Sequence, residues 1–160
     1  GGPVAETIYT ENYTTYGCLY TDPRSTSDQN VNGKDICPYG WHLPNDLEWT
    51  ELMNNTTILE LKSIDNWVDN EVIPNSGNGS NFSGFNALPG GQGTYAYWRD
   101  PIEYSYHGFS QKATFYSSDG SIYDGDPSNG YGSGFWISHW YGLEQISQLA
   151  HYSVRCIKDE

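Results

Sequence analysis

The sequence lacks the long apolar runs of membrane-spanning proteins and the basic residues of nucleic-acid-binding proteins. No apolar run among its 160 residues approaches the roughly 18 residues that a membrane-spanning helix needs, so membrane insertion is not expected. Basic residues are scarce, with 7 Lys and Arg against 20 Asp and Glu, and a formal charge of -13 repels phosphate backbones. We therefore expect no nucleic-acid partner. The start, GGPVAET, lacks the character of a signal peptide, which for an exported protein indicates a processed form or an excised domain.

Motifs of the common enzyme classes are missing as well. The 4 histidines lie far apart and outside any HExxH pattern, and the chain has no GxSxG, P-loop or dinucleotide-binding motif. Paired carboxylates for glycoside hydrolysis depend on three-dimensional geometry, and no pair stands out in the sequence. We predict that the protein is not an enzyme and needs no cofactor. A glycan-active enzyme is the lesser alternative.

Signals for a metal site are weak. The 3 cysteines form no CxxC pair, which disfavours zinc. The segment DGDPSNG, which begins at Asp124, imitates the start of an EF-hand loop, but Phe135 stands where the final acidic ligand belongs. A looser structural Ca²⁺ site that uses Asp119, Asp124 or Asp126 is the alternative to a plain turn.

The cysteines, Cys18, Cys37 and Cys156, allow one disulfide and one free thiol. The residues alone do not decide which two are paired. A bridge from Cys37 to Cys156 would close the longer loop and, in the loop-entropy model, stabilise the fold by up to ~4.7 kcal/mol. The low lysine content and the many Asn, Ser, Gly and Tyr residues are typical of extracellular proteins.

The composition favours short strands joined by long turns over a helical bundle. The chain has 14 Tyr, 6 Trp, 18 Gly and 8 Pro, but only 1 Met. Period-two patterns and turn residues give the individual elements. Short strands are predicted at 15–21, 135–138 and 152–157, a hairpin turn at Asp119-Gly120, irregular loops at 22–34 and 69–84, and a connection at 139–151.

The clearest helix signal lies in CPYGWHLPNDLEW, which begins at Cys37. Asn45 and Glu48 have the spacing of a capping box, and the apolar positions that follow predict a helix over 46–53. The next apolar segment, 58–67, could be a second short helix or a strand. The residues expected to fill the core around this helix are Trp41, Leu43 and Trp49.

The segment FWISHWYG at 135–142 is the best candidate for a binding surface. Exposed Trp and Tyr side chains supply a large contact area at low entropic cost, which suits a protein partner or the apolar face of a sugar. The alternative is that these rings pack in a core that is short of Leu and Met. The predicted binding residues are Trp136, His139, Trp140, Tyr141, Gln145 and Gln148, joined by Tyr104 and Tyr106.

Several motifs together carry a family resemblance. YGCLYT, CPYGWHLPNDLEWTEL, LKSIDNW, GFNALPGG, GFWIS and SVRCIKD occur in the order seen in the Fibrobacter succinogenes major paralogous domain. The resemblance covers about residues 16–159. That family occurs in surface and secreted proteins and in some phages, and it is similar to C-type lectin-like and formylglycine-generating-enzyme-like folds.

The resemblance implies an α+β, C-type-lectin-like fold with one or two helices packed on small antiparallel sheets with long loops. It implies that Cys37 and Cys156 form a disulfide, and that Cys18 is free and buried. The segment 95–131 departs from the family's spacing. The signatures of Ca²⁺-dependent sugar binding are absent, so that mode of binding is not carried over.

We therefore expect residues 1–15 to form an N-terminal extension and 16–160 a single domain. The leading hypothesis is a non-enzymatic, extracellular ligand-binding or adhesion module at a cell surface or on a phage virion, with a protein or glycan ligand. A related use is a displayed variable protein, whose changing residues would lie in 135–152. The alternative is a self-associating structural subunit or decoration of a surface filament or virion.

Overall fold

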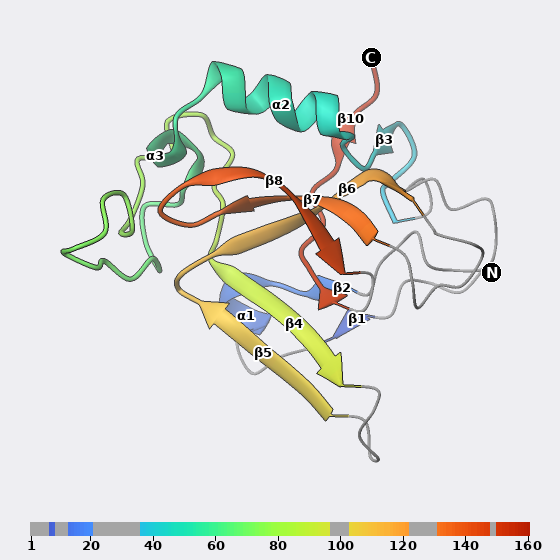
Figure 1. Cartoon of the computed structure of the whole chain (residues 1–160). Coiled ribbons are helices and arrows are strands. Elements are labelled where there is room, and N and C mark those ends of the chain that lie inside the picture. The colour runs from blue at the N-terminus through green and yellow to red at the C-terminus, as the bar shows by residue number, and fades with distance from the viewer. Residues whose placement is uncertain (1–6, 9–12, 21–35, 97–102, 122–130, 148–149) are drawn as a thin grey trace.

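The computed structural model describes residues 7–8, 13–20, 36–96, 103–121, 131–147 and 150–160 (Figure 1). In these residues a few short helices accompany small β-sheets, which confirms the predicted α+β class. The described helices are α1 (Tyr13–Tyr16), α2 (Asp46–Asn55) and α3 (Ile58–Leu61). The described strands are β1 (Thr7–Ile8), β2 (Leu19–Tyr20), β3 (Trp41–His42), β4 (Gly90–Ala96), β5 (Glu103–Phe109), β6 (Ala113–Ser121), β7 (Tyr131–Ile137), β8 (Tyr141–Ser147), β9 (Ala150–His151) and β10 (Ile157–Lys158).

The largest sheet has the strand order β5-β4-β6-β7-β8, and β9 pairs with β4. Its pairs are antiparallel except for the contact between β4 and β6, where Gly91 lies opposite Ala113. Ala113 also lies opposite Ile137, so the β5–β6 and β7–β8 turns are at the same end of the sheet (Figure 1). Two smaller sheets pair β1 with β2 and β3 with β10.

Helix α2 packs across the sheet through an aromatic contact. The predicted capping box is present, because the Asn45 side chain accepts from the Glu48 N–H at 2.9 Å and Glu48 accepts from the Asn45 N–H at 2.8 Å. Trp49 then lies buried against Phe135 of β7, with ring centroids 4.6 Å apart. The helix continues past the predicted end to Asn55.

The hydrophobic core has two parts. The first lies beneath α2 and α3 and contains Trp49, Ile58, Leu61, Trp67, Ala87, Ala113, Phe115, Phe135 and Ile137. The second contains Cys37, Leu43, Tyr116, Ala150 and Tyr152. The prediction that Trp41 belongs to the core is wrong, since 42% of its surface is exposed. Trp41 lies in β3, which among the described strands pairs with β10 in a separate small sheet.

The strand predicted beside Cys18 differs from the structure. The strand expected at 15–21 is divided into α1 and β2, because Gly17 takes the left-handed conformation (φ +83°) that commonly ends a helix. Cys18 beside it is free as predicted, but it is half-buried rather than buried.

The hairpin turn expected at Asp119-Gly120 is wrong, because β6 continues through Ser121 with a register shift between Tyr116 and Gly120. Asp119 instead accepts a hydrogen bond from the Asp46 N–H at the start of α2, at 2.9 Å. Its carboxylate serves a helix N-terminus 73 residues away in sequence.

The segment expected only to connect two strands is itself mostly strand. Residues of 139–151 form β8, which pairs with β7 along its whole length, and β9 follows it. The expected strand 152–157 is correspondingly short, with only β10 at its end. The segment 58–67, for which helix and strand were both open, begins as α3.

A disulfide joins Cys37 to Cys156 across 119 residues, which confirms the pairing implied by the family resemblance. The two cysteines precede β3 and β10, the strands of one small sheet. This bridge therefore holds the end of the chain against the segment that leads into α2.

His42 reinforces the same junction. Its Nδ1 lies 2.6 Å from the Asp159 carboxylate, and its Nε2 lies 2.8 Å from that of Glu48. The hydrogen bond to Asp159, which has the larger effect, and the hydrogen bond to Glu48 raise the pKa of His42 above the ordinary 6.5. A single imidazole ring thus links β3, the capping box of α2 and the residue after β10.

Removal of the disulfide should cause a large loss of stability. We expect the double variant Cys37→Ala/Cys156→Ala to lose about 4 kcal/mol of unfolding free energy, because its unfolded chain regains the entropy of a long open loop. Urea unfolding followed by tryptophan fluorescence measures this. Cys18→Ala is the matched control and should change stability little. Equal losses of unfolding free energy in the double variant and in Cys18→Ala would contradict the pairing of Cys37 with Cys156.

The His42 junction should make stability depend on pH. The pKa of His42 is raised on folding. The stabilisation that its contacts give the folded state is therefore fully present below pH 6.5 and is lost as the pH rises through the raised pKa. The melting temperature of the wild type should therefore fall across this window, and that component should vanish in His42→Gln. The control His107→Gln replaces a histidine of β5 that lies beside Gln92 of β4, and it should keep this pH-dependent fall in melting temperature. An unchanged pH profile in His42→Gln would refute the junction's role.

Candidate functional site

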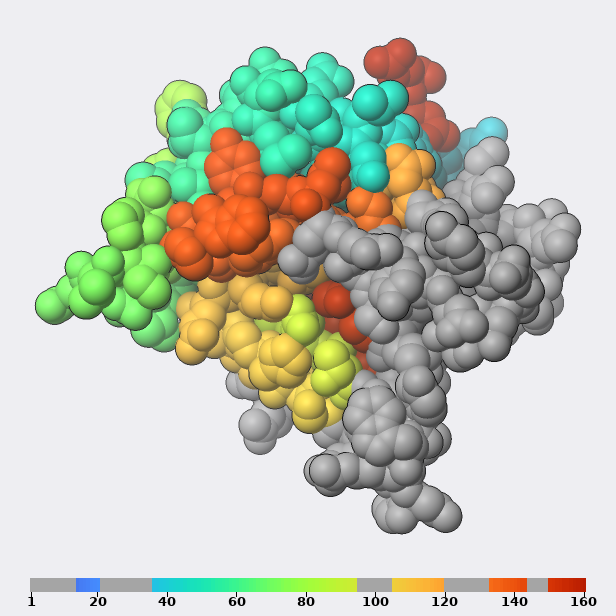
Figure 2. All heavy atoms as spheres, in the orientation of Figure 1, coloured from blue at the N-terminus to red at the C-terminus, as the bar shows by residue number. Residues whose placement is uncertain are grey.

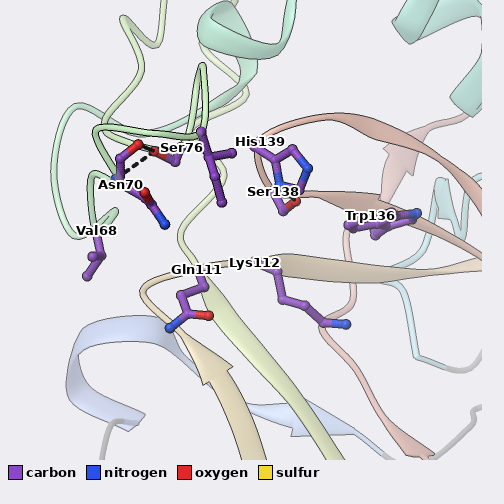
Figure 3. Close-up of a pocket in the computed structure, with 9 residues that line it drawn as sticks. Val68, Asn70, Ser76, Gln111, Lys112, Trp136, Ser138 and His139 are labelled. Carbon is purple, nitrogen blue, oxygen red and sulfur yellow. Dashed lines mark hydrogen bonds between the residues drawn. The ribbon is translucent and has the colours of Figure 1, made fainter.

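A cavity of about 370 Å³ lies at the end of the main sheet where the β5–β6 and β7–β8 turns meet. The loop 68–76 closes its third side (Figure 3). In the space-filling view this loop (green), the β7–β8 turn (orange) and the β5–β6 region (yellow) lie next to one another (Figure 2). The described lining residues are Val68, Asn70, Ile73, Ser76, Gln111, Lys112, Trp136, Ser138 and His139.

The β7–β8 turn supplies the aromatic part of the site. Trp136 and Trp140 meet edge to face, with ring centroids 4.1 Å apart, and 51% of Trp140 is exposed. The Ser138 N–H donates to the Trp140 carbonyl at 2.7 Å, which closes the turn. Ser138 Oγ also lies 3.0 Å from His139 Nδ1, so the imidazole is held at the cavity wall. The turn presents rigid rings at low entropic cost.

The β5–β6 turn supplies a cation. Lys112 Nζ lies 5.8 Å from the centroid of the Trp136 ring, within the range of a cation–π contact. The turn itself is tight, because the N–H groups of Gln111 and Lys112 both donate to the Gly108 carbonyl at 3.0 Å. Lys112 therefore approaches Trp136 from a backbone that is fixed in place.

The third wall, loop 68–76, is organised by the buried Lys62. The Nζ of this fully buried side chain donates to the carbonyls of Asn75, Ser76 and Gly77 at 2.5, 3.1 and 3.1 Å. It also lies 4.1 Å from the centroid of the Trp67 ring. Burial lowers the pKa of Lys62 to about 8, an effect that the carboxylate of Asp69 opposes.

The loop is also tied directly to the neighbouring turn. The Val68 N–H donates to the Ser110 carbonyl at 2.8 Å, and the Trp67 N–H donates to the Asn78 side chain at 2.9 Å. Two of the cavity's three walls therefore share a backbone hydrogen bond. This bond holds the start of loop 68–76 against the β5–β6 turn.

The predicted binding residues fall into different places. Trp136 and His139 line the cavity, and Trp140 stands beside it. Tyr141 instead packs edge-on against Phe135, and its hydroxyl donates to the Thr56 carbonyl at 3.0 Å. Tyr141 therefore packs against the core, as the alternative of core packing describes.

The other predicted residues are not brought to the cavity by the described contacts. Tyr106 lies near the ring of His151, at 6.3 Å between centroids. Tyr104 and Gln145 belong to β5 and β8, and their side chains lie outside the described part of the structure. Gln148, Asp124 and Asp126 lie outside the described residues altogether.

Sequence reasoning missed the polar walls of the cavity. Asn70, Ser76, Gln111 and Lys112 come from segments with only turn signals, and no local pattern marks them as neighbours of Trp136. A weak signal was the lysine within the otherwise apolar and acidic segment ILELKSID, since a charge there needs partners.

The described residues contain no group of three or more His, Cys, Asp or Glu side chains that could hold a metal ion. Asp119, one of the Ca²⁺ candidates, accepts a hydrogen bond from the Asp46 N–H. Within the described part of the chain, no helix is long and apolar enough to cross a membrane.

Comparison with known families decides the relationship that the motifs suggested. The family model of the Fibrobacter succinogenes major domain matches residues 3–158. The chain belongs to this family. No curated protein and no solved structure matches it. In this Fibrobacter succinogenes major domain, CPYGWHLPNDLEW forms the disulfide, β3 and the start of α2, and LKSIDNW contains Lys62 and Trp67.

The Lys62 ammonium should be required for the loop that closes the cavity. We expect Lys62→Met to lose about 3 kcal/mol of stability, because the apolar side chain leaves three carbonyls without their donor. Amide hydrogen exchange in 68–80 should also accelerate. Lys158→Met, at an exposed position of β10, is the control and should alter neither quantity. Equal behaviour of the two variants would contradict this role.

Proposed function

We propose that this Fibrobacter succinogenes major domain is a non-enzymatic, extracellular ligand-binding or adhesion module, and that the cavity beside Trp136 is its binding site. The observation that carries the proposal is the Trp136–Trp140 pair, which places a half-exposed indole beside a cavity with polar walls. Aromatic rings in such a position are the usual anchors of protein and glycan ligands.

The size and chemistry of the cavity support binding over catalysis. Its volume of about 370 Å³ is at the lower end of ligand pockets, roughly 300–1,000 Å³. The described lining residues include amides, hydroxyls, a lysine and a histidine, but no carboxylate or thiol. Two carboxylates are what most glycoside hydrolases need, so the site suits recognition of a ligand better than hydrolysis of one.

The fold relationship supports the same interpretation. We propose a C-type-lectin-like fold, on the basis of one main helix over small sheets and a disulfide near the end of the chain. Long loops carry the binding site in such a fold, and loop 68–76 and the two turns line the cavity proposed here. The disulfide is consistent with an extracellular location.

Trp140 offers a direct test. Trp140→Ala should weaken ligand capture at least about tenfold while the melting temperature changes little, because the ring is half exposed and anchors the ligand rather than the core. Binding would be measured on arrays of polysaccharides and of immobilised extracellular-matrix proteins.

Trp41→Ala is the matched control, since Trp41 is exposed to a similar extent but lies in β3. It should bind as the wild type does. Absence of binding to every arrayed ligand, or equal loss in the two variants, would refute the proposed site.

A further inference from the structure

The loop 68–76 uses polar groups to hold its own path. The Asn70 N–H donates to Ser76 Oγ at 2.7 Å, and Ser76 Oγ lies 3.1 Å from Asp69 Oδ1. Asn70 Oδ1 accepts from the Val72 N–H at 3.1 Å. The polar groups that these bonds join are therefore already partnered within the loop, and the loop is fixed before any ligand arrives.

Two of the side chains that this loop exposes are apolar. Val68 lines the cavity and is 55% exposed. Val72, which is 88% exposed, lies in sequence between the lining residues Asn70 and Ile73. Because the backbone is already ordered, a partner that covers these side chains does not have to order the loop. The loop therefore offers a preformed apolar surface.

A third apolar side chain lies on the β7–β8 turn. Val68 and Trp136 lie on opposite sides of the cavity (Figure 3), and Trp140 packs edge to face against Trp136. Lys112 already lies over the Trp136 ring, with Nζ 5.8 Å from its centroid. The half-exposed Trp140 is therefore the indole that a ligand contacts. We call Val68, Val72 and Trp140 the apolar rim.

The composition of the apolar rim favours a protein segment over a sugar. Valine side chains offer no hydrogen bond, so a sugar hydroxyl that they cover loses its water without a replacement. An aliphatic or aromatic side chain of a protein gains from the same contact, because both apolar surfaces leave water. Apolar side chains meet in this way at the centre of protein interfaces.

The exposed charge beside the apolar rim is negative. Asp69 and Glu71 belong to the same loop, and within the described residues neither forms an ion pair. Asp69 is bonded to a serine hydroxyl of the loop and interacts with the buried Lys62. Lys112 packs over an indole ring, and His139 lies in the wall formed by the β7–β8 turn. Glu71 is therefore the carboxylate that a basic partner can reach.

We propose that the apolar rim binds a protein segment in which an aliphatic or aromatic side chain is flanked by Lys or Arg, with the basic group at Glu71. This assignment rests on the proposed function and specifies its partner class. The formal charge of -13 attracts such a segment at long range and repels an acidic one. The apolar rim then selects it at short range from other cationic surfaces.

A peptide selection tests the proposal. Random dodecapeptides displayed on phage would be panned on the immobilised full chain, and the enriched peptides should combine Lys or Arg with a neighbouring aliphatic or aromatic residue. Fluorescence anisotropy then measures their affinity for variants of the chain. Val72→Ser should weaken binding at least about fivefold and Glu71→Gln about threefold, because an exposed ion pair contributes less than a buried apolar contact.

Matched controls come from the exposed surface of α2. Leu47→Ser removes an apolar side chain that is 79% exposed, as a control for Val72→Ser. Glu51→Gln removes one exposed carboxylate, as a control for Glu71→Gln. Both controls should bind the enriched peptides as the wild type does. Equal weakening by Glu51→Gln would show that only net charge matters and would refute the contact at Glu71.

Other outcomes would overturn the proposal in distinguishable ways. Enriched peptides that need Trp140 but lack a basic residue, or that bind Val72→Ser as tightly as the wild type, would refute the proposed partner while the binding site at Trp140 stands. A polysaccharide captured through Trp140, with no enriched peptide that depends on this ring, would overturn the protein assignment and leave the proposed function intact. Enriched peptides that are insensitive to Trp140→Ala, together with no captured array ligand, would refute both.

Discussion

The buried ammonium of Lys62 is the interaction on which the candidate site depends. A fully buried charge loses its hydration, and the lowering of its pKa to about 8 records that penalty. Three backbone carbonyls and the Trp67 ring offset the loss. Because the carbonyls belong to successive residues, the partners of one cation impose a definite path on a loop that is rich in Asn, Gly and Ser.

Beyond residue 76, the rest of the irregular stretch predicted as the loop 69–84 is ordered by the end of a helix. A helix leaves its last carbonyls without internal partners. The N–H groups of Ser80, Asn81 and Ser83 donate to the carbonyls of Leu59, Lys62 and Glu60, so the loop completes the hydrogen bonding of α3. Gly79 allows this close approach, because a Cβ there would lie 2.4 Å from the Leu59 carbonyl oxygen. Short polar residues are thus a structural requirement in this segment.

Local signals in the sequence predicted the elements whose partners are close in the chain. The capping box of Asn45 and Glu48 spans three positions, and α2 begins where it indicates. Signals with distant partners misled. Asp119-Gly120 has the composition of a turn, but the Asp119 carboxylate binds the start of α2. Tyr141 shows how distant such partners are, because its hydroxyl donates to the Thr56 carbonyl, 85 residues away in sequence.

The sequence by itself determined the α+β class, the helix that begins at Asp46 and, through its motifs, the family and the cysteine pair. Only the tertiary structure decided which aromatic rings stay exposed and which polar residues meet them. Lys112 and Trp136 come from different turns, and loop 68–76 reaches them through Val68 and Ser110. Strand pairing brings the two turns to one end of the sheet, and pairing between distant segments leaves no local pattern in the sequence.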